Sequence, residues 1–202
     1  MSAENFWDIR FKEEVFIYGK KPNNYLRECF LKEDNAGTAY FPGEGEGRNA
    51  VFAALRGWRC LAIDGSVEAK KKCGILAGRK NVEIEYIVSD LREQEKYINR
   101  QFDVIAFSFV HFNATDRIRF HRSLVSFLKK GGRLFFEVFS KEQMEYDSGG
   151  PKNPDMLYST QDLEKDFKGL RIIQNDKQTV TLDEGPYHQG TASVIRFYAV
   201  KE

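Results

Sequence analysis

Three glycines within five positions give the clearest chemical signal in the chain. Gly43, Gly45 and Gly47 belong to the stretch FPGEGEGRNAVFAA (residues 41–54), between a short apolar run and a segment with a helical pattern. Glycines at the start of a helix let a ligand approach the backbone closely, and phosphates often bind there. Glu44 and Glu46 separate these glycines, so the loop places two negative charges where an anion commonly binds.

Two nucleotide-like ligands fit this loop. Residues 45–50 match the pattern G-x-G-x-x-A, and Asp64 follows Gly45 by 19 residues, which together form a fingerprint for NAD. A pyrophosphate about 4 Å from a glutamate would be repelled by roughly 4 kcal/mol at an effective dielectric constant of 20. S-adenosylmethionine carries a sulfonium and an ammonium group and no phosphate, so the charges favour it. Alternatively, Glu44 and Glu46 face solvent and only complement the helix dipole, and Arg48 either faces water or reaches a ligand carboxylate.

Two aspartates stand at the ends of the next two apolar runs. Asp64, in AIDGS, can accept hydrogen bonds from ribose hydroxyls, or it can simply form a turn with Gly65. Asp90, in YIVSDL, can accept a hydrogen bond from the exocyclic amine of adenine, or it can cap a following helix. We include Gly65 and Leu91, their neighbours, in the predicted cofactor site.

The elements that position these residues alternate between strand-like and helical patterns. We expect a doubly wound, Rossmann-like sheet of seven mostly parallel strands that ends in an antiparallel hairpin. Ser66 is expected to cap the second helix, Gly57 to follow the end of the first, and the fourth helix to span 115–130. The expected strands are 38–42, 59–63, 82–88, 102–109, 133–139, 170–182 and 191–200. Because parallel sheets bind ligands at the carboxyl ends of their strands, the glycine loop occupies the expected place for a site.

Composition and charge narrow the classes of function. The 202 residues are 42% hydrophobic, with no apolar stretch long enough to span a membrane, and we expect a single domain consisting of an N-terminal lid segment (1–37) and a core (38–202). The net charge is +1, so no overall field attracts nucleic acid, and the run AKKKC (69–73) is expected to be a solvated helix face. The N-terminus lacks the order of a signal peptide, which predicts a cytoplasmic protein. Cys29, Cys60 and Cys73 lack the spacing of a metal site, so we expect no metal and three core or near-core thiols.

The chain resembles the class I S-adenosylmethionine-dependent methyltransferases, and within them the tellurite-resistance-type small-molecule methyltransferases. The resemblance is carried by FWDIRF, YGKKPNNYL, GEGEGRNAVFAA, AIDGS, VSDL, LKKGGRLFFEVFS and DEGPYHQGTASVIR.

The resemblance assigns roles to single residues. It implies that the backbone of Gly43, Glu44, Gly45 and Gly47 holds the methionyl part of the cofactor, with Asp64 at the ribose, Asp90 at adenine and Phe109 beside the methionine. It further implies that Trp7, Arg10 and Tyr18 belong to a lid. The family commonly has an acid where this chain has Phe41, so Glu44 or Glu46 is a candidate to contact the cofactor's ammonium group instead.

Methyl transfer from a sulfonium needs alignment of the reacting atoms, and it needs a base only when the acceptor arrives protonated. His111, in SFVHFN, stands where the methyl group is expected and is our candidate base, although a structural role is equally compatible with its place. His188, in EGPYHQG, and Glu137 are candidate substrate-side residues, as is the loop 143–154, whereas His121, in RIRFHRS, is expected on the surface.

The resulting hypothesis is an enzyme, a monomer or homodimer, that transfers a methyl group from S-adenosylmethionine to a thiol, an oxyanion such as tellurite, or another small acceptor. The alternatives are an NAD-dependent oxidoreductase and a non-catalytic module that binds S-adenosylmethionine.

Overall fold

A seven-stranded sheet forms the centre of the computed structural model, which describes residues 3–202. The strand order is β3-β2-β1-β4-β5-β7-β6, in which β1 to β5 pair in parallel and β7 pairs antiparallel with both β5 and β6. The strands are β1 (Thr38–Pro42), β2 (Arg59–Asp64), β3 (Glu85–Val88), β4 (Phe102–Ser108), β5 (Leu128–Phe139), β6 (Arg171–Asp183) and β7 (Gln189–Val200). The predicted fold class, with its C-terminal antiparallel hairpin, is therefore confirmed.

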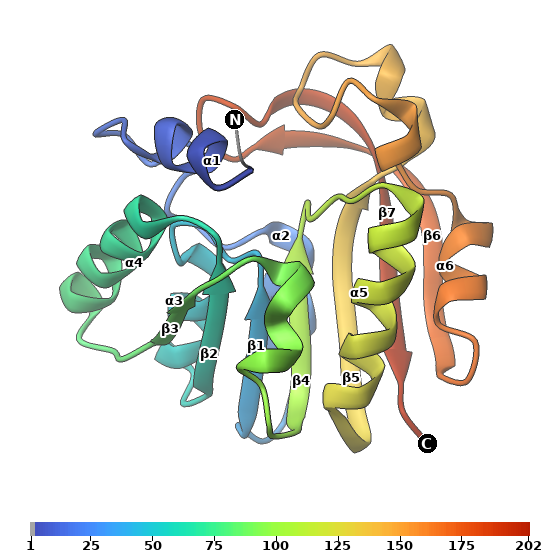
Figure 1. Ribbon diagram of the computed structural model, residues 1–202, viewed down its shortest axis with the longest axis horizontal. Helices are drawn as coiled ribbons and strands as arrows, with labels where there is room; N and C mark the ends of the chain where they lie inside the picture. Colours follow the sequence, from blue (N-terminus) through green and yellow to red (C-terminus); the bar gives the residue numbers. More distant parts are fainter. Residues whose placement is uncertain (1–2) are drawn as a thin grey trace.

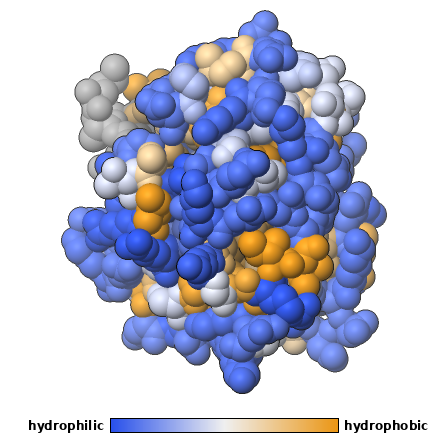
Figure 2. Space-filling view, turned by 90° about the vertical axis from the view of Figure 1, so that its right-hand side faces the viewer, coloured by the Kyte–Doolittle hydropathy of each residue, from blue (hydrophilic) through white to orange (hydrophobic). Residues whose placement is uncertain are grey.

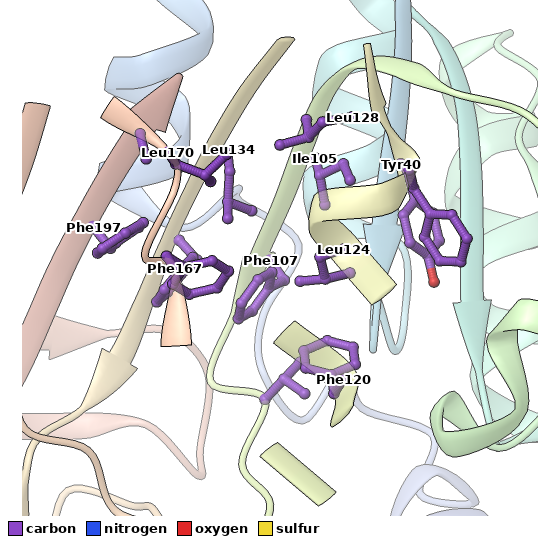
Figure 3. Packing of buried hydrophobic residues seen from close by; sticks show 14 of the residues in the cluster. Tyr40, Ile105, Phe107, Phe120, Leu124, Leu128, Leu134, Phe167, Leu170 and Phe197 are labelled. Atoms are coloured by element: carbon purple, nitrogen blue, oxygen red, sulfur yellow. The ribbon is translucent and has the colours of Figure 1, made fainter. Parts of the chain in front are cut away.

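Helices cover both faces of the sheet (Figure 1). The α-helices are α1 (Ala3–Phe11), α2 (Asn24–Leu31), α3 (Arg48–Leu55), α4 (Val67–Lys80), α5 (Ala114–Phe127) and α6 (Thr160–Asp166). The 3-10 helices are η1 (Leu91–Lys96), η2 (Lys141–Glu145) and η3 (Pro154–Met156). One apolar cluster joins the sheet to α5 and α6, and a second joins its other face to α2, α3 and α4. Figure 3 shows part of the first cluster, in which Phe107 of β4 lies beside Phe120 and Leu124 of α5.

Local signals place most of the helix ends. The side chain of Ser66 accepts the backbone N–H of Ala69 and caps α4, as predicted. Gly57, with φ of 87°, follows the end of α3 in the left-handed conformation that glycine tolerates best. The predicted end of the fourth helix at residue 130 is wrong, because α5 ends at Phe127 and the fully buried Leu128 already pairs with Phe102 in the sheet. Likewise β3 begins at Glu85 rather than at residue 82.

Three segments meet over the carboxyl ends of the parallel strands. In Figure 1 helix α1 and the turn between β6 and β7 lie above the upper ends of β1 and β2, and the chain between β5 and α6 lies above the upper ends of β5 and α5. The turn contacts the N-terminal segment directly, because Tyr187 donates its backbone N–H to the carbonyl of Ile17 at 3.3 Å. Segments from both ends of the chain therefore enclose the edge of the sheet at which a ligand is expected.

The face that bears β6 and α6 is mostly polar. Figure 2 faces the side that bears β6 and α6, and it shows a largely hydrophilic surface interrupted by an apolar patch. Ile173 of the edge strand β6 is half exposed. No helix within residues 3–202 is long and apolar enough to cross a bilayer. The three cysteines are buried free thiols, as predicted.

Candidate active site

A cavity of about 800 Å³ lies at the carboxyl ends of β1, β2 and β4. Its walls come from the glycine loop, the residues after β2, β3 and β4, helix α1, the chain after β5 and the turn between β6 and β7. The volume lies in the range of sites that bind small molecules and cofactors. Of the predicted site residues, all line this cavity except Gly47 and Glu137.

The glycine loop needs all three of its glycines, for two different reasons. Gly43, Gly45 and Gly47 have φ values of 66°, 60° and 91°, in the region that other residues rarely adopt. A Cβ atom on Gly43 would approach Val110 to 2.5 Å, and one on Gly47 would approach the Sγ atom of Cys73 to 2.4 Å. Gly43 and Gly45 thus form a cradle that faces the cavity, whereas Gly47 allows α3 to pack against α4.

Glu44 caps the helix that follows it. Its Oε1 atom accepts the backbone N–H groups of Asn49 at 2.8 Å and of Ala50 at 2.7 Å, within the first turn of α3. The carboxyl group is buried, and burial raises its pKa to about 7. The alternative in which Glu44 faces solvent is therefore wrong, and two of the N–H groups that could hold a phosphate at this helix are already used.

Glu46 binds the N-terminal segment. Its carboxylate accepts the backbone N–H groups of Ile17 and Tyr18, both at 3.2 Å, and forms an ion pair with Lys72 at 2.8 Å. Glu46 is buried, so the solvent-facing alternative is wrong for it as well. Lys72 is also buried, so the expected solvated face of AKKKC is wrong for this lysine, whereas Lys70 and Lys71 are exposed as predicted. The second negative charge of the loop thus holds the segment that encloses the cavity.

Asp64, at the end of β2, and Asp90, after β3, both line the cavity. Asp64 accepts the backbone N–H groups of Gly45 and Ser66, each at 3.0 Å, and burial raises its pKa to about 6. Asp90 accepts the backbone N–H of Arg92 at 2.8 Å and caps η1, so its capping role is confirmed. Both aspartates line the cavity together with their neighbours Gly65 and Leu91.

The side chain of Arg48 extends from the glycine loop to the turn between β6 and β7. Its Nη2 atom forms a buried ion pair with Glu184 at 2.8 Å, so the alternative in which Arg48 faces water is wrong. Burial would raise the pKa of Glu184, but Arg48 and His188 outweigh it and hold that pKa at about 2. Sequence reasoning missed Glu184, although an acid in DEGPYHQ was the available signal for a partner of Arg48.

The candidate base His111 has both ring nitrogens occupied by backbone groups. Nδ1 lies 2.9 Å from the carbonyl oxygen of Met156, which requires a proton on Nδ1, and Nε2 accepts the N–H of Phe139 at 3.3 Å. Burial lowers the pKa of His111 to about 4, so the ring is neutral at neutral pH. This geometry favours a structural role, and its role as a base stays a prediction.

Aromatic rings form the wall opposite the aspartates. Phe109 has φ of 58°, a strained conformation for a residue with a side chain, and its ring stacks on Phe139 with centroids 4.5 Å apart. His188 packs edge-on against Phe109, at 4.6 Å between centroids, and burial lowers its pKa. Glu137 is buried away from the cavity and pairs with Arg196 at 2.8 Å, which corrects its placement as a substrate-side residue. His121 is fully buried beside Asp166, so its predicted surface position is wrong.

Helix α1 lies over the cavity beside the start of α4. Trp7, Arg10 and Tyr18, the predicted lid residues, all line the cavity. Asp8, which sequence reasoning missed, accepts a hydrogen bond from the hydroxyl of Ser66 at 2.6 Å and so ties α1 to the start of α4. Arg10 stacks over the ring of Tyr187 at 4.5 Å from the turn between β6 and β7.

Comparisons with known proteins find a matching family model and several solved structures with the same fold. Residues 42–136 match the family model described as "Methyltransferase domain". No curated protein matches the sequence. Among solved structures, one reported for the conversion of a disulfide bond into a thioacetal group during echinomycin biosynthesis superposes with a TM-score of 0.81 at 14% identity, covering 100% of this chain and 92% of that chain.

Two further solved structures have the same fold at similarly low identity. TehB from Haemophilus influenzae superposes with a TM-score of 0.71 at 13% identity, covering 98% of this chain and 67% of that chain. Magnesium protoporphyrin IX methyltransferase from Synechocystis PCC 6803, solved with bound S-adenosylmethionine, also gives 0.71, at 15% identity, covering 100% of this chain and 98% of that chain.

Proposed function

Since the matched family model and the fold identify this chain as an S-adenosylmethionine-dependent methyltransferase, we propose that it methylates a small-molecule acceptor in the cavity over the carboxyl ends of β1, β2 and β4. When bound, the cofactor would supply an electrophilic methyl group on sulfur: the acceptor would bond to the methyl carbon in line with the methyl–sulfur bond, that bond would break, and S-adenosylhomocysteine would leave. The chain's own contribution is alignment, which can supply about 7 to 11 kcal/mol of the barrier reduction.

The main support for the placement of the cofactor is that Glu44 caps the first turn of α3. The N–H groups of Asn49 and Ala50 are bound by Glu44, so a pyrophosphate would meet the carboxyl group of Glu44 there instead of these two free donors. The cradle of Gly43 and Gly45 still accepts an uncharged or cationic group at close range. We place the methionyl part of S-adenosylmethionine at this cradle, the ribose at Asp64, and adenine near Asp90 and Leu91, with Phe109 beside the methionine.

The acceptor end of the cavity supports a small, uncharged or anionic nucleophile. Its walls include Phe109, Phe139, Met156 and His188. Among the residues that the structure describes, the lining carboxylates belong instead to the glycine loop, to Asp64 and Asp90, and to Asp116 of α5. A protonated amine would therefore lack a counter-charge at the acceptor end, whereas a thiol or an oxyanion would not need one.

The resemblance to the tellurite-resistance-type methyltransferases makes an oxyanion such as tellurite one candidate acceptor, beside thiols and other small organic molecules. We further propose that the enzyme acts in the cytoplasm as a monomer or homodimer and does not bind nucleic acid, in keeping with its net charge of +1.

Ligand-dependent thermal unfolding tests the proposal, with S-adenosylmethionine, S-adenosylhomocysteine and NADH compared in parallel. A ligand present at 100 times its Kd stabilises the folded state by about 2.7 kcal/mol. We expect both adenosyl compounds to raise Tm and NADH to leave it unchanged. Stabilisation by NADH alone would overturn the cofactor assignment, and release of S-adenosylhomocysteine across a panel of thiols and oxyanions would separate an enzyme from a non-catalytic binding module.

A further inference from the structure

Asn23, in the loop before α2, uses every polar atom of its side chain. It is fully buried, and its Nδ2 atom donates to Oε1 of Glu137 at 2.7 Å and to Oε1 of Glu184 at 2.9 Å. Its Oδ1 atom accepts the backbone N–H of Leu26 at 3.0 Å and so caps α2. A carboxamide has two N–H groups, and here each of them binds a different carboxylate.

The two carboxylates have different partners on their other sides. Glu137, on β5, receives a charged hydrogen bond from Arg196 of β7 at 2.8 Å. Glu184, in the turn between β6 and β7, receives one from Arg48 at 2.8 Å, and its Oε2 atom lies 3.7 Å from Nδ1 of His188. Asn23 is thus the neutral donor that keeps two buried acids at fixed places between two arginines.

Other contacts also hold the turn, among them the ion pair of Glu184 with Arg48 and the packing of Arg10 on the ring of Tyr187. Glu184 donates its backbone N–H to the carbonyl of His188 at 2.9 Å, and Tyr187 reaches Ile17 at 3.3 Å. The ring of His188 then rests between Phe109 and Tyr18, with centroid distances of 4.6 and 4.5 Å. Without the amide of Asn23, Glu184 would lose a donor inside the protein and would face the like charge of Glu137, which favours movement of the turn.

We propose that Asn23 is a positioning residue for the acceptor end of the cavity: it holds Glu184, and through Glu184 it sets the place of the turn and of His188 in the cavity wall. This inference rests on the proposed function in one respect: it assumes that the acceptor binds beside the part of the cavity wall that His188 forms. Asn23 itself does not line the cavity.

The substitution Asn23→Asp separates this role from helix capping. Aspartate caps a helix as well as asparagine does, so the bond to Leu26 is preserved, but the donor to both acids is replaced by a third carboxyl group. Asn24→Asp is the matched control, because it makes the same change of charge at the exposed neighbouring residue. Asn23→Ser, which keeps a capping hydroxyl and adds no charge, serves if Asn23→Asp does not fold.

Three measurements read out the result. Hydrogen exchange of residues 183–189 reports the turn, the NMR signal of His188 is identified readily because the chain has only 3 histidines, and calorimetry gives the Kd of S-adenosylhomocysteine. We expect Asn23→Asp, or Asn23→Ser, to speed exchange in the turn at least about tenfold and to shift the His188 signal, with Kd within about threefold of the unaltered protein. Asn24→Asp should leave all three unchanged.

Wild-type exchange in the turn and an unshifted His188 signal in a folded Asn23 variant would overturn the inference. A different result would overturn the proposed function: the unaltered protein would then not bind S-adenosylhomocysteine.

Discussion

The Oε1 atom of Glu44 accepts the N–H groups of both Asn49 and Ala50, so an acid inside the glycine loop caps the helix that the loop begins. A helix start usually offers such N–H groups to a ligand or to the side chain of the capping residue. Here the capping residue is Gly47, which has no side chain, and Glu44 supplies the acceptor from three positions earlier. The carboxyl group of Glu44 therefore binds the helix that follows the loop.

Removal of this cap should destabilise the protein. Glu44→Ala leaves two buried N–H groups without an acceptor, and we expect a loss of about 2 kcal/mol in the free energy of unfolding, measured in urea. Glu44→Gln retains an amide oxygen in the same place and should cost less than half as much. Equal losses for the two variants would show that the carboxylate charge, and not the acceptor geometry, supports the helix.

The carboxyl group of Glu44 should also make the stability of the protein depend on pH. Burial raises the pKa of Glu44 from its usual value of 4.5 to about 7, so the folded protein holds this proton more tightly than the unfolded chain does. Its contribution to stability is complete below pH 4.5 and is lost as the pH rises through 7. Glu44→Gln lacks this titration, so the variant should gain stability relative to the unaltered protein between pH 5 and about 8 in urea unfolding series. A constant difference across that range would contradict the assignment.

Asp64 should make cofactor affinity depend on pH. Ribose hydroxyls donate to the ionised carboxylate, and burial raises the pKa of Asp64 to about 6, so protonation competes with the ligand below that value. We expect the Kd of S-adenosylhomocysteine to rise up to about tenfold between pH 7 and pH 5 in calorimetric titrations. Asp64→Asn should bind at least about tenfold more weakly at pH 7, with little change between the two pH values. Unaltered affinity in this variant would remove Asp64 from the ribose site.

The ion pair between Glu46 and Lys72 should hold the N-terminal segment. Lys72→Met leaves a buried carboxylate without its cation, and breaking such a pair costs about 3 to 5 kcal/mol. We expect faster proteolysis between residues 12 and 20 and a lower Tm, with partial recovery of Tm in the double variant Glu46→Gln, Lys72→Met. Lys71→Met is the control, because Lys71 is exposed and pairs only with Glu68 on the surface. If Lys71→Met had the same effect, general loss of helix charge would be the cause.

Much of the fold follows from local patterns, as the strands around the glycine loop illustrate. The run 38–42 (TAYFP) is mostly apolar and contains two aromatic residues, and it forms β1 with the predicted bounds. The end of α5 was not predictable in the same way, because two lysines and two glycines after Phe127 have the composition of a helix end. The deciding contact is Leu128, which is fully buried and pairs with Phe102, 26 residues earlier in the chain.

The site was predictable where a residue's role depends on its own neighbours in sequence. Gly43, Gly45 and Asp64 line the cavity because strand ends meet at one edge of a parallel sheet. Roles that depend on a distant partner were not predictable. His121 stands among charged residues in sequence, yet it is buried because Asp166, 45 positions away, bonds to its Nδ1 atom at 2.8 Å. The same holds for Lys72 with Glu46 and for Arg48 with Glu184.

His111 gives a prediction that separates a base from a structural residue. Its Nδ1 proton binds the carbonyl of Met156 and its Nε2 atom accepts from Phe139, so protonation requires loss of one of these bonds. Burial lowers the pKa of His111 from its usual value of 6.5 to about 4. The corresponding contribution to stability is therefore complete above pH 6.5 and is lost as the pH falls through 4.

We expect the NMR signal of His111 to show no titration between pH 5.5 and about 8, and His111→Asn to destabilise the protein more at pH 7 than at pH 4.5. If the same variant keeps its Kd for S-adenosylhomocysteine, the ring supports the contact between β5 and η3 without touching the cofactor. A titration of His111 near pH 6.5, together with loss of turnover and unchanged stability in the variant, would instead establish it as the base. His188 is the internal comparison, because its Nδ1 atom faces Glu184 and has no backbone partner in the described part of the chain.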